Sequence, residues 1–516
     1  MLNFFKKYKI KGYQKLKISN QLYKIEDLKY DFEKNFKYHF NSKTQSNFEY
    51  SDSESIFKTT VLNYILDNKF NKFILFSYGL CNKVFFPAPP EIVDFIDRNY
   101  FKTNKFICSL LWIVILNKTL FKNIYNLLKI SQFLFNYKKQ NFLKYDQIIF
   151  INSLSSGNFN FNSSSFNVIN WIKKHFTKSE NQYLFIHSNL NYKKKITYKN
   201  ISIVFLQYPI INSKLSNNFF KITNYLLHNL FNIFKKINRN WFESILFKQN
   251  LIFNLSNENN IIFDKIFCNN SDYISRPLWT YNSKYNSNLF FYFYSTNYLK
   301  FNKNKDEYNL PVGYYSMKWP NYIFWNQSQL NHFSKFKNVI KSSIINHPVS
   351  LSDTSSYINI DYNDHKIISL FNVQPLSYHN YIDYCLSGID DYYNYDNCIK
   401  FYSDIINLIK DKKVILLIKE KRFNSDIDEE YIKYINKIKL LPFVKLIHYE
   451  FSPYKLINIS DLIISIPYTS TAIIADHLNK PSIYFDPTNL INSSHFYDID
   501  TYNSSNIAEY INEKIK

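Results

Sequence analysis

The last third of the chain alternates apolar runs of strand length with amphipathic helical segments, and this alternation most strongly limits what the chain can fold into. Strands are predicted at 366–373, 413–421, 444–450, 461–467 and 481–486, with helices at 398–410, 426–441, 452–460 and 470–479. Continuous apolar strands that alternate with helices form a parallel sheet covered on both faces. We therefore predict a Rossmann-like domain over residues 366–495.

The middle of the chain shows the same rhythm less regularly. Strands are predicted at 147–152, 183–188, 201–207, 264–268 and 289–295, with helices at 166–176 and 219–237. This pattern predicts a second α/β domain over 131–335, joined to the first by a polar linker at 336–365. Residues 1–130 are mostly helical and have no assigned fold, and the last helix, in 496–516, is expected to return across the gap between the domains. The fold class is therefore α/β, with two Rossmann-like domains facing a cleft in a GT-B-type arrangement.

The chain is strongly basic, with a formal net charge of +22 over 516 residues. Such a charge suits an anionic partner: nucleic acid, a membrane surface or a phosphate-bearing substrate. It also suits an AT-rich coding sequence, which enriches lysine without a binding role, and the lysines scatter along the chain. The densest group lies in the first forty residues, where it is either a membrane-surface contact or a mobile end.

An apolar run from Phe106 to Leu116 is shorter than the roughly 20 residues that a spanning helix needs. It predicts a buried core helix, with an in-plane membrane helix as the alternative.

The five cysteines form no CxxC pair, which argues against a disulfide framework or a zinc site and fits a reducing compartment. His332, His347 and His379 have no partners at metal-ligand spacing, and no signal peptide is expected.

Three hydroxyl residues, Thr469, Ser470 and Thr471, lie between the strand that Pro467 ends and a helix expected to begin at Ala472. The first N–H groups of a helix lack partners and the helix dipole is positive there, so a phosphate fits this position. Hydroxyl side chains would then donate the hydrogen bonds that glycine-rich loops leave to the backbone. The alternative is ordinary helix capping with no ligand.

A basic group, Lys419, Lys421 and Arg422, follows another predicted strand of the same sheet. The carboxyl ends of parallel strands meet at one edge, so these cations are expected beside the hydroxyl turn, where they can neutralise a leaving phosphate. A solvated strand end is the alternative interpretation.

The segment SDLIISIPYTSTAIIADHLNKPSIYFDPT resembles the signature of bacterial surface-polysaccharide biosynthesis proteins named for a PFTS motif, with Tyr468 in place of Phe. Further pieces resemble the family in the same order: NNSDYISRPLWTY, FYFYSTN, YIFWNQSQLNHF, FNVQP and KEKR. The resemblance covers roughly residues 260 to 492. It differs at Asn479, where glycine is common but asparagine can take the left-handed backbone, and at Ile474, where a ribose-binding acid often stands.

The resemblance implies a glycosyltransferase of capsule or O-antigen assembly, similar in layout to transferases that use CMP-activated acid sugars. Residues 366–495 would bind the nucleotide-sugar donor and residues 131–335 the acceptor. Tyr468, Thr469, Ser470 and Thr471 would hold phosphate with help from Lys419, Lys421 and Arg422. The acceptor would be a glycan or a lipid-linked glycan, and the protein would act in the cytoplasm, peripherally at the inner membrane face.

Asp272 and Arg276 follow a predicted strand of the first domain, so Asp272 is a candidate general base for the acceptor hydroxyl. Alternatively, Asp272 caps a helix and Arg276 pairs with it. No metal ion or cofactor is required, because no DxD pair stands at a convincing strand end. Two other functions stay open: a nucleotide-sugar epimerase of similar shape, and a basic non-catalytic scaffold that binds membranes or nucleic acid. We favour the transferase and expect no nucleic-acid partner.

Overall fold

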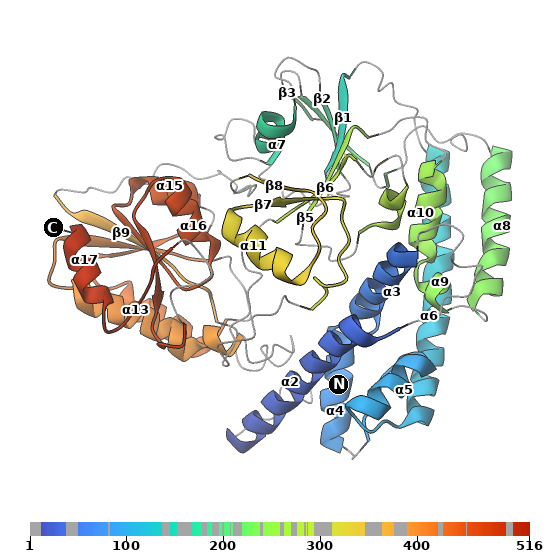
Figure 1. Cartoon of the computed structure of the whole chain (residues 1–516), viewed down its shortest axis with the longest axis horizontal. Coiled ribbons are helices and arrows are strands. Elements are labelled where there is room, and N and C mark those ends of the chain that lie inside the picture. The colour runs from blue at the N-terminus through green and yellow to red at the C-terminus, as the bar shows by residue number, and fades with distance from the viewer. Residues whose placement is uncertain are drawn as a thin grey trace.

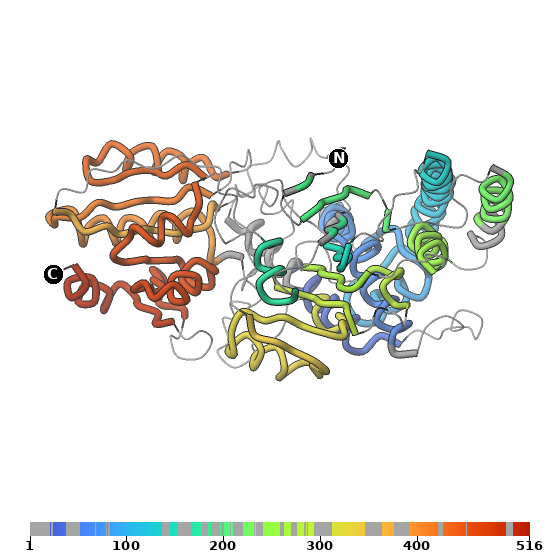
Figure 2. Tube along the Cα trace, turned by 90° about the horizontal axis from the view of Figure 1, so that it is seen from above, coloured from blue at the N-terminus to red at the C-terminus, as the bar shows by residue number. Residues whose placement is uncertain are grey.

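A computed structural model shows a helical N-terminal region and two parallel sheets arranged along the long axis of the molecule (Figure 1). Figure 2 shows the second sheet at one end, the first sheet in the middle and the long helix pair α6 and α8 at the other end. The structure describes residues 12–37, 50–80, 83–136, 145–151, 168–177, 183–187, 196–198, 201–206, 208–209, 219–237, 241–257, 263–269, 276–282, 285, 287–293, 312–345, 364–375, 390–421, 427–449, 451–491 and 499–515.

The second sheet has six strands, each parallel to its neighbours, in the order β11-β10-β9-β12-β13-β14. They are β9 (Lys366–Phe371), β10 (Val414–Lys419), β11 (Val444–Ile447), β12 (Leu462–Ser465), β13 (Ser482–Asp486) and β14 (Thr501–Asn503). The helices are α13 (Tyr395–Ile409), α14 (Glu429–Ile438), α15 (Pro453–Ile459), α16 (Ser470–His477) and α17 (Ile507–Ile515). Numbered within the domain, this order is 3-2-1-4-5-6, that of a doubly wound nucleotide-binding sheet.

The first sheet has the order β3-β4-β2-β1-β5-β6-β7-β8, and only β3 runs antiparallel to its neighbour. Its strands are β1 (Gln147–Ile151), β2 (Tyr183–His187), β3 (Ile196–Tyr198), β4 (Ile201–Phe205), β5 (Lys265–Asn269), β6 (Leu289–Tyr292), β7 (Asn321–Phe324) and β8 (Ser342–Ile344). The fold class of two Rossmann-like domains is confirmed. The sequence analysis missed β3, β7, β8 and β14, and β8 lies inside the segment that was predicted to be a linker.

The N-terminal region is helical in the part that the structure describes. It contains α2 (Gly12–Asn35), α3 (Tyr50–Tyr64), α4 (Asn68–Leu80), α5 (Pro90–Asn99) and α6 (Lys105–Asn136). A buried carboxylate attaches it to the first domain: Glu33 of α2 accepts hydrogen bonds from the backbone N–H groups of Gly313, at 2.7 Å, and Ser316. Burial raises the pKa of Glu33, and these donors offset the cost of burying the charge.

The prediction of a short core helix at Phe106–Leu116 was wrong in length and in burial. Helix α6 has 32 residues, and Phe106, Ile113 and Val114 are all more than half exposed. By length and composition alone α6 could cross a membrane, and 17% of its most apolar stretch is buried.

The sequence analysis also placed 219–237 within the first Rossmann-like domain. In the structure α8 (Phe219–Ile237) packs against α6, beside α9 (Trp241–Ile245) and α10 (Phe247–Asn257).

The C-terminal helix does not return to the first domain. Ile507 and Ile511 of α17 are fully buried in the core of the second domain, and Lys412 donates a hydrogen bond to Asn512. Figure 1 shows α17 beside α13, at the end of the molecule that is far from the first sheet. The short strand β14 explains the difference, because it extends the second sheet and delivers the chain directly to that sheet's own covering layer.

This packing makes a prediction about stability. Replacing Ile511 by alanine removes fully buried atoms, and we expect it to destabilise the second domain by roughly 2–5 kcal/mol. Thermal unfolding together with hydrogen exchange in α17 measures the effect. Glu513→Ala, an exposed change on the same helix, is the matched control and should leave both readouts unchanged. Equal effects of the two substitutions would contradict the placement of α17.

Candidate functional site

The carboxyl ends of β9 and β12 form the switch point of the second sheet, where the chain order reverses. Ligands of open parallel sheets bind outside this point. Phe371 of β9 lies in register with Lys419 on one side and with Ser465 on the other. Neighbouring strands are about 4.8 Å apart, so the basic segment and the hydroxyl turn leave the sheet about 10 Å from each other. The two segments therefore lie at one edge of the sheet, as predicted.

The hydroxyl residues lie in a tight strand-to-helix turn. Helix α16 begins at Ser470, where the helix predicted at 470–479 begins and two residues before Ala472, with Thr469 as its N-cap. The Thr469 side chain makes no cap hydrogen bond and instead donates to the Ile466 carbonyl at 2.9 Å. The first N–H groups of a helix have no acceptor within the helix. The N-terminus of α16 therefore has anion-binding character without a side-chain cap, which disfavours the simple capping alternative.

The two threonines brace this turn from within. The Thr471 hydroxyl lies 3.0 Å from the buried Ser465 hydroxyl and 3.3 Å from that of Thr469. This chain of hydroxyl groups ends at the Ile466 carbonyl. Of the three predicted hydroxyls, those of Thr469 and Thr471 thus shape the turn, while the partly exposed Ser470 opens the helix.

Tyrosines from elsewhere hold the turn's carbonyl groups on its buried side. Tyr393, at the end of the 3₁₀ helix η5 (Asp390–Tyr393), donates to the Pro467 carbonyl, and Tyr484 of β13 donates to the Thr469 carbonyl, both at 2.8 Å. The sequence analysis missed this role. The sequence gives no local signal for it, since the tyrosines lie 74 and 15 residues from their acceptors.

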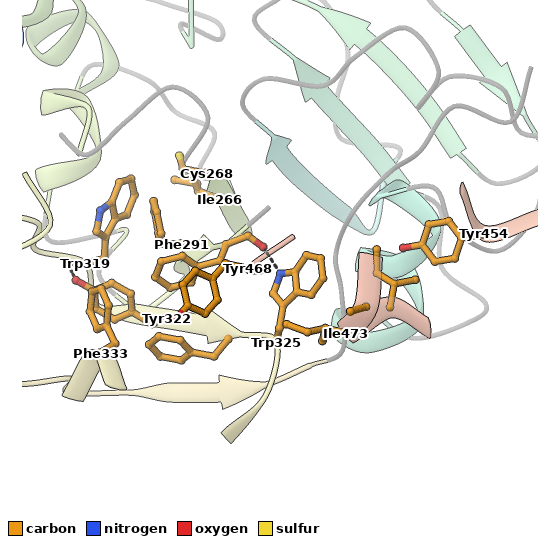
Figure 3. Packing of buried hydrophobic residues seen from close by; sticks show 14 of the residues in the cluster. Ile266, Cys268, Phe291, Trp319, Tyr322, Trp325, Phe333, Tyr454, Tyr468 and Ile473 are labelled. Carbon is orange, nitrogen blue, oxygen red and sulfur yellow. Dashed lines mark hydrogen bonds between the residues drawn. The ribbon is translucent and has the colours of Figure 1, made fainter. Parts of the chain in front are cut away.

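Tyr468 packs the turn into a hydrophobic cluster that both domains share. Its φ angle of 64° lies in the left-handed region, which is unfavourable for a bulky residue. Its ring is buried in a cluster that contains residues of both sheets, including Trp325, which directly follows β7. Figure 3 labels Trp325, Tyr468 and Ile473 of α16 among the residues of this cluster. The structure thus gives Tyr468 a packing role, where the resemblance implied a phosphate contact.

The predicted cations differ in their surroundings. The Lys419 ammonium group donates to the backbone carbonyls of Glu420, His448 and Tyr449, so it fastens the end of β11. Burial lowers the pKa of Lys419 to about 8. Lys421 is exposed, and its carbonyl accepts a hydrogen bond from Gln374, in the segment that follows β9. Lys421 thus lies near the switch point, whereas Arg422 lies outside the described residues.

The candidate catalytic residues follow β5 in the sequence, and β5 with β1 forms the switch point of the first sheet. Asp272 is outside the described residues. Arg276 is buried, donates through Nε to the Thr280 hydroxyl at 3.1 Å and stacks on Tyr281 with its guanidinium carbon 4.1 Å from the ring centre. These contacts organise the 3₁₀ helix η3 (Leu278–Tyr281), which gives Arg276 a structural role.

Asn479 and His332 are two further residues that the sequence analysis singled out. Asn479 has a φ angle of 54°, so the asparagine takes the left-handed turn as predicted. His332 is buried and burial lowers its pKa to about 4, consistent with a neutral structural residue. Within the described ranges, no group of three or more His, Cys, Asp or Glu side chains could hold a metal ion.

Comparison with protein families gives one specific match. The family model described as polysaccharide biosynthesis PFTS motif protein matches residues 227–511, more than half of the chain. The match begins within α8 and ends within α17, so it includes the hydroxyl turn, the whole second sheet and strands β5 to β8 of the first sheet. A search of curated proteins finds no significant match.

Solved structures show only distant likeness. One is the N-terminal domain of trehalose-6-phosphate phosphatase from Candida albicans, with 14% identity and a TM-score of 0.38 over 73% of this chain and 91% of that chain. Another is a UDP-forming α,α-trehalose-phosphate synthase from Burkholderia vietnamiensis, with 7% identity and a TM-score of 0.36 over 71% of this chain and 89% of that chain. A third is a mutant of TarM from S. aureus with Fondaparinux, α-GlcNAc-glycerol and UDP, with 16% identity and a TM-score of 0.31 over 51% of this chain and 52% of that chain. These TM-scores are too low to bear on function.

The tyrosine clamp on the turn can be tested by removing one hydroxyl. Tyr484→Phe leaves the Thr469 carbonyl without its donor, which we expect to cost about 1–3 kcal/mol of stability. Thermal unfolding measures this loss. Tyr449→Phe, at a more exposed tyrosine of the same domain, should have no comparable effect, and a similar loss in both variants would argue against the clamp.

The role of Lys419 predicts a pH dependence. Its pKa is lowered from 10.5 to about 8 in the folded protein, so between these values the unfolded chain holds a proton that the folded protein has released. Stability relative to Lys419→Met should therefore rise as the pH increases from about 8 toward 10. Urea unfolding of both proteins across this range measures the difference. A difference that falls with pH would contradict the buried position of the ammonium group.

Proposed function

This chain belongs to the family of polysaccharide biosynthesis PFTS motif proteins, and we propose that it is a glycosyltransferase that takes a sugar from a nucleotide-activated donor. The observation that carries the proposal is the N-terminus of α16, which lies without a side-chain cap at the switch point of a doubly wound sheet. Phosphate is the group that this position of the fold favours.

The donor phosphate would bind to the first N–H groups of α16 and to the Ser470 hydroxyl. The turn suits this role because three of its carbonyl oxygens, those of Ile466, Pro467 and Thr469, already accept hydrogen bonds from side-chain hydroxyls. Their negative dipoles are therefore engaged within the protein and repel an anion less. Lys421 would add a positive charge from the neighbouring segment, and Lys419 and the two threonines would keep both segments in shape.

The reaction would be a displacement at the anomeric carbon. The acceptor hydroxyl oxygen forms a bond to that carbon, the bond from the carbon to the phosphate oxygen breaks, and the nucleotide leaves with the negative charge. Donors that are already oriented toward the leaving oxygen lower the barrier, because they need no reorganisation during the reaction. Asp272, in the segment that follows β5 of the first domain, is the proposed base that takes the acceptor proton.

The finer assignment follows the family. We propose a role in capsule or O-antigen assembly, with a glycan or lipid-linked acceptor, in the cytoplasm at the inner membrane face, and with no metal ion or cofactor. A CMP-linked donor is proposed from the family's similarity to transferases of acid sugars. Ile474 is consistent with a donor whose ribose is not held by an acid on this part of α16.

Nucleotide binding tests the proposal. Calorimetric titration with CMP, UDP and GDP should show binding of one of them, about tenfold weaker in Ser470→Ala and in Lys421→Ala, since each loses one contact to a charged group. Lys445→Ala, an exposed lysine on β11, is the matched control. Loss of affinity in the control alone, or no nucleotide binding at all, would refute the site. Conversion of a nucleotide sugar without an acceptor would favour an epimerase instead.

A further inference from the structure

Helix α6 has two apolar faces, and among the described residues one of them packs against the rest of the fold. Its buried positions include Cys108, Trp112, Leu127 and Leu134, which repeat at helical spacing and contact the hydrophobic clusters of the N-terminal region and of α8–α10. A second set of apolar side chains is at least 49% exposed and recurs at spacings of three, four and, once, eight residues: Phe106, Leu110, Ile113, Phe121, Tyr125 and Leu128. At 100° per residue this second set forms a stripe of its own along the helix.

The neighbouring helix α8 also carries exposed apolar side chains. Phe220, Leu227 and Phe231 of α8 follow one another at seven- and four-residue spacing and are 79%, 59% and 68% exposed. Helix α8 packs along α6, and Figures 1 and 2 both show the pair at the outer end of the molecule, opposite the second domain. Exposed aromatic and aliphatic side chains on two adjoining helices are more than the scattered apolar residues of an ordinary surface.

The charges on these helices have one sign. Helix α6 carries four lysines, helix α8 carries three, and neither contains an acidic residue. Lys118, Lys122 and Lys129 are exposed and follow the outer stripe of α6 along one border. Lys248 of α10 lies close enough to Lys122 and Lys129 for both to lower its pKa, after the larger effect of burial. An apolar stripe bordered by lysines is complementary to an anionic lipid surface.

We propose that the outer face of α6 and α8 is a membrane-docking surface, on which the helices lie in the plane of an anionic bilayer. The apolar stripe enters the boundary between headgroups and acyl chains, and the lysines contact lipid phosphates. In-plane docking keeps the inner face of α6 in place, including the hydrogen bond of 2.8 Å from the buried Asn123 to the Ser244 carbonyl. A membrane-spanning α6 would break these contacts and place Lys118 and Lys122 in the hydrocarbon.

This surface would hold the enzyme against its lipid environment while both sheets stay in water. The inference does not depend on the proposed glycosyl transfer, because the surface lies on different helices from the hydroxyl turn. It also differs from a contact through the basic N-terminal residues 1–11, which lie outside the described residues.

Vesicle flotation of the full chain tests the proposal. The wild-type protein should float with vesicles of phosphatidylcholine containing 30% phosphatidylglycerol and bind less at high salt. The variant Phe121→Ser/Leu128→Ser/Phe231→Ser should bind about tenfold more weakly, because binding scales with the buried apolar area. Leu440→Ser, at an exposed leucine of the second domain, is the matched control and should bind as the wild type does. Nucleotide affinity should be equal in all three proteins.

Each other occupant of the face predicts a different outcome. Unchanged flotation of the triple variant would overturn the proposal, and would place any lipid contact elsewhere in the chain. If light scattering shows a wild-type dimer that the triple variant makes monomeric, a second copy covers the face instead. Protein that resists an alkaline carbonate wash would show that α6 spans the bilayer, which also overturns in-plane docking.

Discussion

The backbone of Tyr468 is the constraint on which the arrangement of the site depends. A tyrosine in the left-handed region costs roughly 1–3 kcal/mol and persists only where surrounding contacts compensate. Here the ring is buried in the cluster shared by the two domains, and the next residue is held by a tyrosine hydroxyl at its carbonyl. The same residue therefore turns the chain from β12 into α16 and places a side chain of that turn in the core that the two domains share.

This arrangement explains how a phosphate-binding turn can work with little glycine. Glycine usually supplies positive φ angles and close approach to a ligand. In this chain, which has five glycines among 516 residues, Tyr468 and Asn479 supply the positive φ angles on either side of α16. The carbonyl groups that glycine-rich loops leave to solvent accept hydrogen bonds from Tyr393, Tyr484 and Thr469. Hydrogen bonds from side chains thus fix the turn that glycine would otherwise make possible, and the shape of the turn therefore depends on residues far away in the sequence.

The elements that could be predicted from the sequence are those that a local pattern of residues encodes. Buried parallel strands carry continuous apolar residues, so β9, β10, β12 and β13 were found almost residue by residue, and parallel topology then placed the hydroxyl and basic segments at one sheet edge. The tyrosine clamp was not predictable, because nothing near Tyr393 or Tyr484 indicates a carbonyl acceptor in another segment. Strands β7 and β8 were missed because they are short, and β8 is exposed at the sheet edge.

Helix α6 shows why the direction of an apolar face cannot be predicted from periodicity alone. Burial and membrane contact select the same residues at the same spacing, so a run such as Phe106–Leu116 is compatible with a core helix and with a lipid-facing helix. The distinction comes from what the rest of the chain covers. The N-terminal core, α8, α9 and α10 cover one side of α6, and the apolar side chains of the other side stay exposed. The lysine positions become informative once the exposed side of the helix is known. Residues 118, 122 and 129 are separated by four and seven residues, which are about one and two helical turns, so the three lysines lie along one border of the helix.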